Sequence, residues 1–183
     1  AATTLVVTNT SAAAAALTWM FIEWKITGKP TLLGGATGAV AGLATITPAS
    51  GFVSPLSAIL IGVIAAAICY IAVAVVKLKF AYDDSLDAFG VHGIGGLVGT
   101  LATGLFAQKI FNPAGNNGLF FGNAAQFGVQ ALGAFAVIIY SVCVTLALLK
   151  ILDLLLGLRV TDEEEVIGLD ISQHEESAYT LLD

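Results

Sequence analysis

The sequence DDSLDAFGVHGIGG, residues 83–96, opens an apolar stretch that runs to Ala107 and contains a single histidine, His92. An ionisable side chain at membrane depth is costly, so it normally faces a protein interior or a water-filled path rather than lipid. A neutral imidazole accepts one hydrogen bond and donates another, which suits a polar station in a narrow path. The alternative is a structural histidine that pairs with a carbonyl or hydroxyl group on an adjacent span. We expect the functional role for His92.

The composition indicates the class of protein. Hydrophobic residues make up 57% of the 183 positions, charged residues make up 11%, and the mean hydropathy is +0.92. A soluble domain of this length could not bury so much apolar surface in one core. The formal net charge of -6 arises from acids crowded into residues 162–183, and nothing is basic enough to indicate nucleic-acid binding. We therefore predict an all-α integral membrane protein.

Polar and Gly/Pro-rich points divide the chain into apolar runs that approach the about 20 helical residues needed to cross a bilayer. The second run is short and ends in a turn at residues 47–51, and the fifth is longer than one span requires. Residues 1–156 are thus predicted to hold the membrane helices, and residues 157–183 an acidic tail. The predicted spans are residues 2–22, 31–47, 56–77, 86–107 and 124–156.

The positive charges predict the orientation. Only Lys109 falls on one side of the predicted spans, and the positive-inside rule makes the other side cytoplasmic. The tail is then cytoplasmic and Ala1 lies outside. An odd number of spans beginning outside leads us to expect that a matching half precedes Ala1, as in transporters built from two inverted halves. The residues that mark the cytoplasmic side are Lys25, Lys29, Lys77, Lys79, Lys150 and Arg159.

Glycines recur every fourth residue on two of the predicted helices, a spacing that lets neighbouring backbones approach closely. We expect a packing role for both sets rather than a role in binding a ligand. The first set is Gly34, Gly38 and Gly42, and the second is Gly95 and Gly99.

The acids before His92 have two interpretations. If the helix starts near Ser85, His92 lies about 12 Å along it. Asp84 either caps the helix N-terminus or stabilises a cation deeper in the protein, and both remain open. For Asp83 and Asp87 we expect capping and solvation. We expect no metal site, no cofactor and no enzyme activity, because the sequence has no nucleophile–base pair, phosphate loop or metal-ligand cluster.

Four segments, in order over nearly the whole chain, resemble the ammonium transporter family (Amt/Mep, related to the Rh proteins). The segment with Gly-Val-His-Gly at its centre resembles the signature helix of that family, and the start of the tail resembles the family's cytoplasmic tail. In one departure, Glu175 stands where the family usually has glycine after the histidine. The four segments are residues 30–38, 47–55 and 83–96, together with the tail start at Gly157, Leu158, Arg159, Gly168 and Asp170.

The resemblance implies a fold and a mechanism. Family members are homotrimers with one pore per subunit and eleven spans, of which the first ten form two inverted repeats; this chain would supply the last five spans. Two pore histidines, one from each half, share a hydrogen bond in a hydrophobic conduit, and His92 occupies the place of the second. Thr37 falls where a small hydroxyl residue lines the pore, and Asp84 matches an acid whose counterpart supports substrate recruitment. Ammonium loses its proton and passes as ammonia.

The resulting expectation is the C-terminal half of an ammonium channel-transporter in the plasma membrane, with the N-terminal half as its partner. The five tail residues that resemble the family's tail would be regulatory. The resemblance also implies that a PII-type signalling protein docks on the cytoplasmic face. The alternative is an ammonium sensor with the same membrane fold. We expect transport, because no linker to another domain follows the tail in this sequence.

Overall fold

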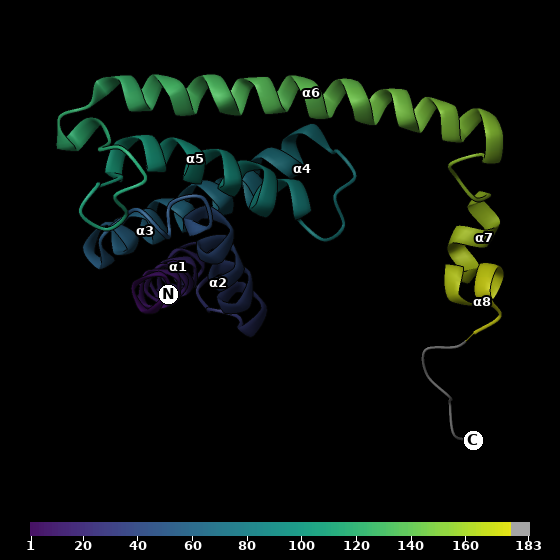
Figure 1. The fold of residues 1–183 in the computed structure, drawn as a ribbon. Coiled ribbons are helices and arrows are strands. Elements are labelled where there is room, and N and C mark those ends of the chain that lie inside the picture. The colour runs from purple at the N-terminus through teal and green to yellow at the C-terminus, as the bar shows by residue number, and fades with distance from the viewer. Residues whose placement is uncertain (177–183) are drawn as a thin grey trace. The chain divides into compact units, whose positions relative to one another are not determined.

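The computed structural model of the protein describes residues 1–176, whose regular structure is entirely helical, as predicted (Figure 1). The chain divides into two units, Ala1–Ala136 and Val137–Asp183, and the longest helix, α6, crosses the boundary between them. The α-helices are α1 Ala2–Thr27, α2 Leu32–Ile46, α3 Pro55–Ile71, α4 Lys77–Phe80, α5 Ile94–Phe106, α6 Ala124–Leu156, α7 Asp162–Ile167 and α8 Leu169–His174. Two π-helices, η1 Ala72–Val76 and η2 Phe89–Gly93, and a 3-10 helix, η3 Leu119–Phe121, complete them.

Four candidate membrane spans lie within the described residues, where the sequence predicted five. They are Ala2–Thr27, Pro55–Phe80, Phe89–Phe106 and Ala124–Leu156. The remaining predicted span corresponds to α2, whose 15 residues fall short of the about 20 that cross a bilayer. Pro30 lies just before this helix and Pro48 lies in the turn that follows it, so prolines limit its length at both ends.

Side-chain and backbone caps set the helix ends in the first unit. Gly28, at φ 83°, ends α1 in the left-handed conformation that glycine adopts readily, and its N–H donates to the Trp24 carbonyl. The Thr31 hydroxyl accepts a 2.9 Å hydrogen bond from the Gly34 N–H and caps α2. In the same way, Ser54 caps α3, with Pro55 at its first position.

Small residues let α1, α2 and α3 pack closely. A methyl group at Gly38 would lie 2.5 Å from Trp19 Cβ, and one at Gly42 would lie 2.6 Å from Ala15 Cβ. The Ser11 hydroxyl is buried and donates to the Gly42 carbonyl at 3.1 Å. These contacts confirm the packing role predicted for the glycines of the second helix.

Two groups of buried side chains form the core of the first unit. In the second, the rings of Trp19 and Tyr70 meet edge to face with their centroids 5.2 Å apart. Val91, the residue before His92, belongs to that group, so the backbone next to the histidine is anchored in the core. The first group is Val7, Ile46, Ala49, Val53, Ala58, Ile61 and Ala102. The second group is Ala15, Trp19, Ala41, Ala66, Cys69, Tyr70 and Val91.

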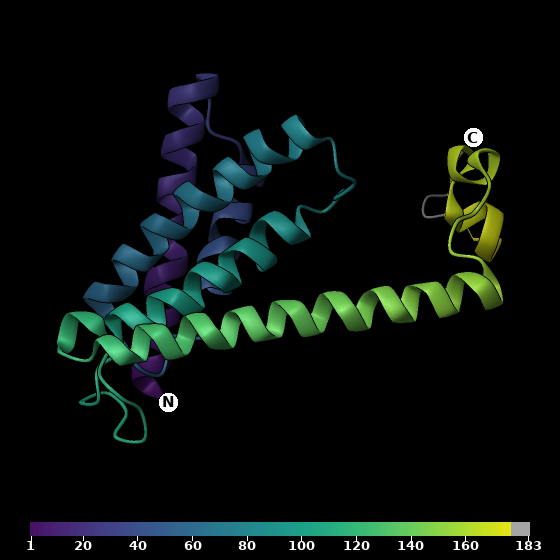
Figure 2. The same cartoon turned by 90° about the horizontal axis from the view of Figure 1, so that it is seen from above.

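The helix that follows His92 runs beside α3 and also contacts α2 (Figure 2). Farther along α5, a methyl group at Gly104 would lie 2.9 Å from the Phe127 Cα, so the start of α6 approaches this helix. None of the 33 residues of α6 is buried within the described chain.

In the second unit, α7 and α8 pack against each other. Gly157, at φ 76°, follows the end of α6, and Gly168, at φ 104°, joins α7 to α8. Thr161 and Glu164 form a reciprocal capping box at the start of α7. Residues 177–183 of the predicted tail lie outside the described residues.

Candidate functional site

Asp84 determines where the helix that carries His92 begins. Its carboxylate accepts hydrogen bonds from the backbone N–H groups of Ala88 at 2.8 Å, Phe89 at 3.0 Å and Gly90 at 3.5 Å. Of the two interpretations that the sequence left open for Asp84, the geometry shows capping. Asp84 lies before the helix that it caps, and the first turn of that helix is η2. The predicted start near residue 86 is therefore wrong. His92 lies about 5 Å from the helix start rather than about 12 Å.

Lys77 ties the end of the preceding span to this turn. Its Nζ forms an ion pair with Asp87 Oδ1 at 2.7 Å and donates a second hydrogen bond to the Asp84 carbonyl. For Asp87, which was expected to cap a helix and to be solvated, the structure shows a partly exposed carboxylate that is ion-paired. Both side chains remain partly exposed, at 24% and 29%.

His92 is exposed on η2 and has no hydrogen-bond partner among residues 1–176. Residues on either side of it are held against the core: Gly90, Val91 and Gly95 are buried. The Cys69 thiol, on α3, donates to the Val91 carbonyl at 3.9 Å. The backbone around His92 is thus fixed by contacts on its packed side. On the opposite side, the imidazole is exposed and makes no hydrogen bond within residues 1–176. The structural alternative, a pairing with a carbonyl or hydroxyl group on an adjacent span, is not found within the described chain.

Thr37 lies half-buried on α2, the helix that packs against both η2 and α5. Within residues 1–176, no hydrogen bond joins Thr37 to His92 or to Asp84. The structure therefore brings the three predicted residues to adjacent elements without a direct bond between Thr37 and the other two.

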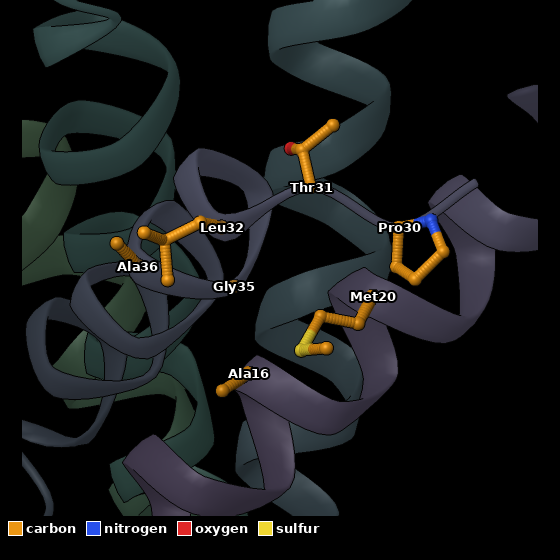
Figure 3. Close-up of a pocket in the computed structure, with 7 residues that line it drawn as sticks. All are labelled: Ala16, Met20, Pro30, Thr31, Leu32, Gly35 and Ala36. Atoms are coloured by element: carbon orange, nitrogen blue, oxygen red, sulfur yellow. The ribbon is translucent and has the colours of Figure 1, made fainter.

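An open groove of about 400 Å³ lies between α1 and the start of α2 (Figure 3). Next to it, the Glu23 carboxylate accepts hydrogen bonds from the backbone N–H of Thr31 at 2.8 Å and from its hydroxyl at 3.0 Å. The groove is apolar and contains neither Thr37 nor His92. Across the described residues, no group of three His, Cys, Asp or Glu side chains is placed to hold a metal ion. The groove is lined by Ala16, Met20, Pro30, Thr31, Leu32, Gly35 and Ala36.

The tail is organised around Glu164, which is not among the predicted regulatory residues. Its carboxylate accepts hydrogen bonds from the Thr161 backbone N–H and hydroxyl, both at 2.9 Å, and from Gln173 Nε2 at 3.0 Å. These bonds, above all that from the Thr161 N–H, hold the pKa of Glu164 below its usual range. The signal was present, because Thr-x-x-Glu is the pattern of a capping box.

The predicted tail residues lie in or beside the connections between helices of this unit. Gly157 and Gly168 adopt positive φ, Leu158 is half exposed at 48%, and the Asp170 carbonyl accepts a 2.9 Å hydrogen bond from the Glu176 N–H. Arg159 lies between the end of α6 and the start of α7. These residues give the tail its turns, whereas Thr161 and Glu164 begin α7.

Glu175 ends α8 in the left-handed conformation, at φ 53°. Glycine adopts this conformation without the steric cost that a side chain adds. The structure therefore gives a physical reason why glycine suits this position.

Comparison with known proteins places these features in a family. The model of the Ammonium Transporter Family matches residues 1–179. The ammonium transporter of Bacillus subtilis is 51% identical over 172 residues, which cover 94% of this chain and 43% of that protein. Among solved structures, Saccharomyces cerevisiae Mep2 is similar with a TM-score of 0.85 and 36% identity, over 97% of this chain and 42% of that one.

A structure titled "Sensor Amt Protein" is also similar, with a TM-score of 0.82 and 32% identity over 94% of this chain and 42% of that chain. The chain thus spans less than half of the length of each of these relatives. The family model matches almost every residue, and 51% of the aligned residues are identical in the Bacillus subtilis protein. Both findings agree with the helical architecture described above. The chain belongs to the ammonium transporter family.

Proposed function

We propose that this chain forms the C-terminal half of an ammonium channel-transporter of the cell membrane. Family membership, the four long apolar helices and the share of each relative that the chain covers support this proposal. In it, α2 crosses the membrane as a fifth, short span, and the preceding half supplies the spans needed for the eleven-helix, inverted-repeat fold.

The observation that carries the proposal is the environment of His92. Its imidazole is exposed and without a partner in residues 1–176, although it lies in the first turn of a helix apolar enough to cross a membrane. An unpaired polar group in hydrocarbon costs on the order of several kcal/mol. A second histidine from the preceding half would satisfy this imidazole, and the two would line a narrow path between the halves.

The proposed chemistry uses the predicted residues in separate roles. Ammonium gives up its proton near His92, ammonia passes along the hydrophobic path, and the proton follows the histidine pair. Thr37 contributes a hydroxyl group to the lining. Asp84 contributes indirectly, because its hydrogen bonds to three backbone N–H groups fix the turn that carries His92.

The test replaces each of the two histidines of this chain in the full-length transporter. His92→Ala should lower ammonium-driven current by about tenfold or more, or change its ion selectivity, because a positioned proton-transfer group contributes on the order of a hundredfold. The matched control is His174→Ala, which removes the exposed tail histidine at the end of α8. Unchanged current and selectivity in inserted His92→Ala would contradict the proposal.

The tail is proposed to be cytoplasmic and regulatory, in a homotrimer whose cytoplasmic face accepts a PII-type signalling protein. Its folded α7–α8 pair and its acids support a docking role rather than a purely solvated one. Deleting residues 160–183 should change flux or its response to a PII protein while the spans still insert. Equal flux from intact and truncated transporter, with and without PII, would leave the tail without this role.

A second candidate function is ammonium sensing, which the similarity to the structure titled "Sensor Amt Protein" favours. The two functions differ in what the complete protein does when ammonium binds. Ammonium-dependent flux in liposomes that contain only the purified protein supports transport. Ammonium binding without flux, together with a signalling output in cells, supports sensing.

A further inference from the structure

His92 does not share a side of its helix with Gly95 and Gly99, two of the glycines that follow it. In a regular α-helix, residues three and seven positions apart lie on the same face, so His92 would point the same way as Gly95 and Gly99. Both glycines are buried against α2: a methyl group at Gly95 would lie 2.9 Å from Thr45 Oγ1, and one at Gly99 would overlap the Thr45 carbonyl group. His92 is exposed. The helix is therefore not regular between these positions.

The irregularity is the π turn η2. The Ile94 N–H donates to the carbonyl of Phe89, five residues earlier, where an α-helix uses the fourth residue. Because a π turn contains more residues than an α turn, each residue within it advances by a smaller angle, and positions three and seven apart no longer share one face. As a result, Gly90, five residues before Gly95, is buried on the packed side, and His92 is turned out of that side.

A second π turn, η1, packs against the first. Gly90 lies at this contact, because a methyl group there would lie 2.7 Å from Val73 Cγ2 and 3.6 Å from the Val73 nitrogen. Farther along the same turn, the Cys69 thiol donates to the Val91 carbonyl. Before it, the Asp84 carboxylate accepts the first N–H groups. The wide turn is thus held at its start, at Gly90 and at Val91.

We propose that Gly90 is a positioning residue: its contact with Val73 between the facing π turns keeps η2 wide and turns the His92 imidazole away from α2 and α3 into the conduction path. This inference rests on the proposed function of His92. A side chain at position 90 would separate the two turns, and η2 could then relax toward a regular helix that directs His92 at Thr45 and Cys69.

The test is a compensating pair of substitutions in the full-length transporter. Gly90→Ala adds the methyl group that meets Val73, and should lower ammonium flux by about tenfold or more, since displacements on the order of 1 Å cost up to a hundredfold. Val73→Ala removes the atom that the methyl group would strike, which leaves the 3.6 Å contact to the backbone nitrogen, an ordinary distance. The double variant should therefore recover most of the flux of Val73→Ala and the wild-type pH profile of transport.

Gly128→Ala on α6 is the matched control, because a methyl group there meets no atom of the described chain within 4 Å. It should conduct like wild type. The pH profile, measured per inserted transporter, separates the positioning of His92 from a loss of folded protein. If Gly90→Ala does not reach the membrane, the double variant decides: a normal amount and pH profile support the inference, and failure to fold or conduct overturns it.

His92→Ala, measured in parallel, distinguishes the two proposals. If it changes flux and pH profile whereas Gly90→Ala changes neither, the positioning role is wrong and the proposed function stands. If Gly90→Ala impairs flux and Val73→Ala does not restore it, the positioning role is also wrong. If His92→Ala itself behaves as wild type, the proposed function fails.

Discussion

Two helices of this chain begin with a carboxylate that accepts backbone N–H groups, but they are held in different ways. At η2, Asp84 caps a turn whose next residues, Gly90 and Val91, are buried against α3 and η1. At α7, Glu164 and Thr161 cap a helix of 6 residues, none of them buried. The start of η2 depends on tertiary packing as well as on its cap, whereas the start of α7 depends mainly on local hydrogen bonds.

This difference separates a fixed element from an adjustable one. A packed backbone opens only with the surrounding core, while an exposed short helix opens locally at low free energy. The turn that carries His92 is therefore expected to hold one geometry. The α7–α8 pair is expected to respond to substitution and pH.

Removing the Asp84 carboxylate should have the largest effect. Asp84→Ala leaves the N–H groups of Ala88 and Phe89 without their acceptor, and should destabilise the transporter by about 2 kcal/mol. Thermal unfolding in detergent measures the loss. Ser85→Ala, which removes one 3.4 Å hydrogen bond to Asp83, is the control. If both variants unfold at the same temperature, Asp84 does not hold the turn.

Removing the cap of α7 should have a smaller and more local effect. Thr161→Ala deletes the hydroxyl group that accepts the Glu164 N–H and donates to its carboxylate, at a cost of about 1 kcal/mol. Hydrogen exchange should accelerate in residues 162–167 but not in α5, and Thr161→Ser should retain protection. Faster exchange throughout the first unit would show that the tail is not the local element described here.

Glycine at position 175 should stabilise the end of α8 slightly. Glu175→Gly removes the cost of a side chain in the left-handed conformation, but glycine also gains freedom when unfolded, so the net gain is about 0.5 kcal/mol. Glu176→Gly, at a neighbouring position without positive φ, should give no gain. The measurement is hydrogen exchange in residues 169–176. Equal protection in both variants would contradict the argument from backbone conformation.

Acidification should weaken α7 by the smallest amount. Because hydrogen bonding lowers the folded-state pKa of Glu164, its contribution is complete above the ordinary carboxyl range and is lost as the pH falls through that lowered value. Helical chemical shifts of residues 162–167 should thus stay constant from about pH 7 to about pH 4 and decline below that range. Glu164→Gln should remove this dependence. A decline that begins well above the ordinary range would contradict the sign of the shift.

Much of the helical architecture follows from periodicity and composition. The α6 helix covers residues 124–156, the stretch that the sequence predicted. The start of the His92 helix is predicted too early, because the Asp84 carboxylate accepts the N–H of Ala88 and caps a helix that begins after Asp87. A cap of this kind depends on the turn that precedes the helix, so spacing alone left two roles open for Asp84.

The rest of the site depends on contacts that no local pattern contains. The π turn at Phe89–Gly93 lies where Gly90 meets Val73, a residue on a different helix. The pairing of Lys77 with Asp87 across the connecting turn is likewise a tertiary contact. The capping box at Thr161 and Glu164, by contrast, follows from the spacing of two residues close in sequence.

Reconstitution of residues 1–183 tests most directly the central claim that the exposed His92 face is one half of a path. The purified chain in liposomes should give no ammonium-dependent pH change or current above that of empty liposomes, because its imidazole lacks the opposing half. Supplying the preceding half of the transporter should restore flux, and His92→Ala in that pair should reduce it again. Robust ammonium flux from residues 1–183 by themselves would contradict the claim.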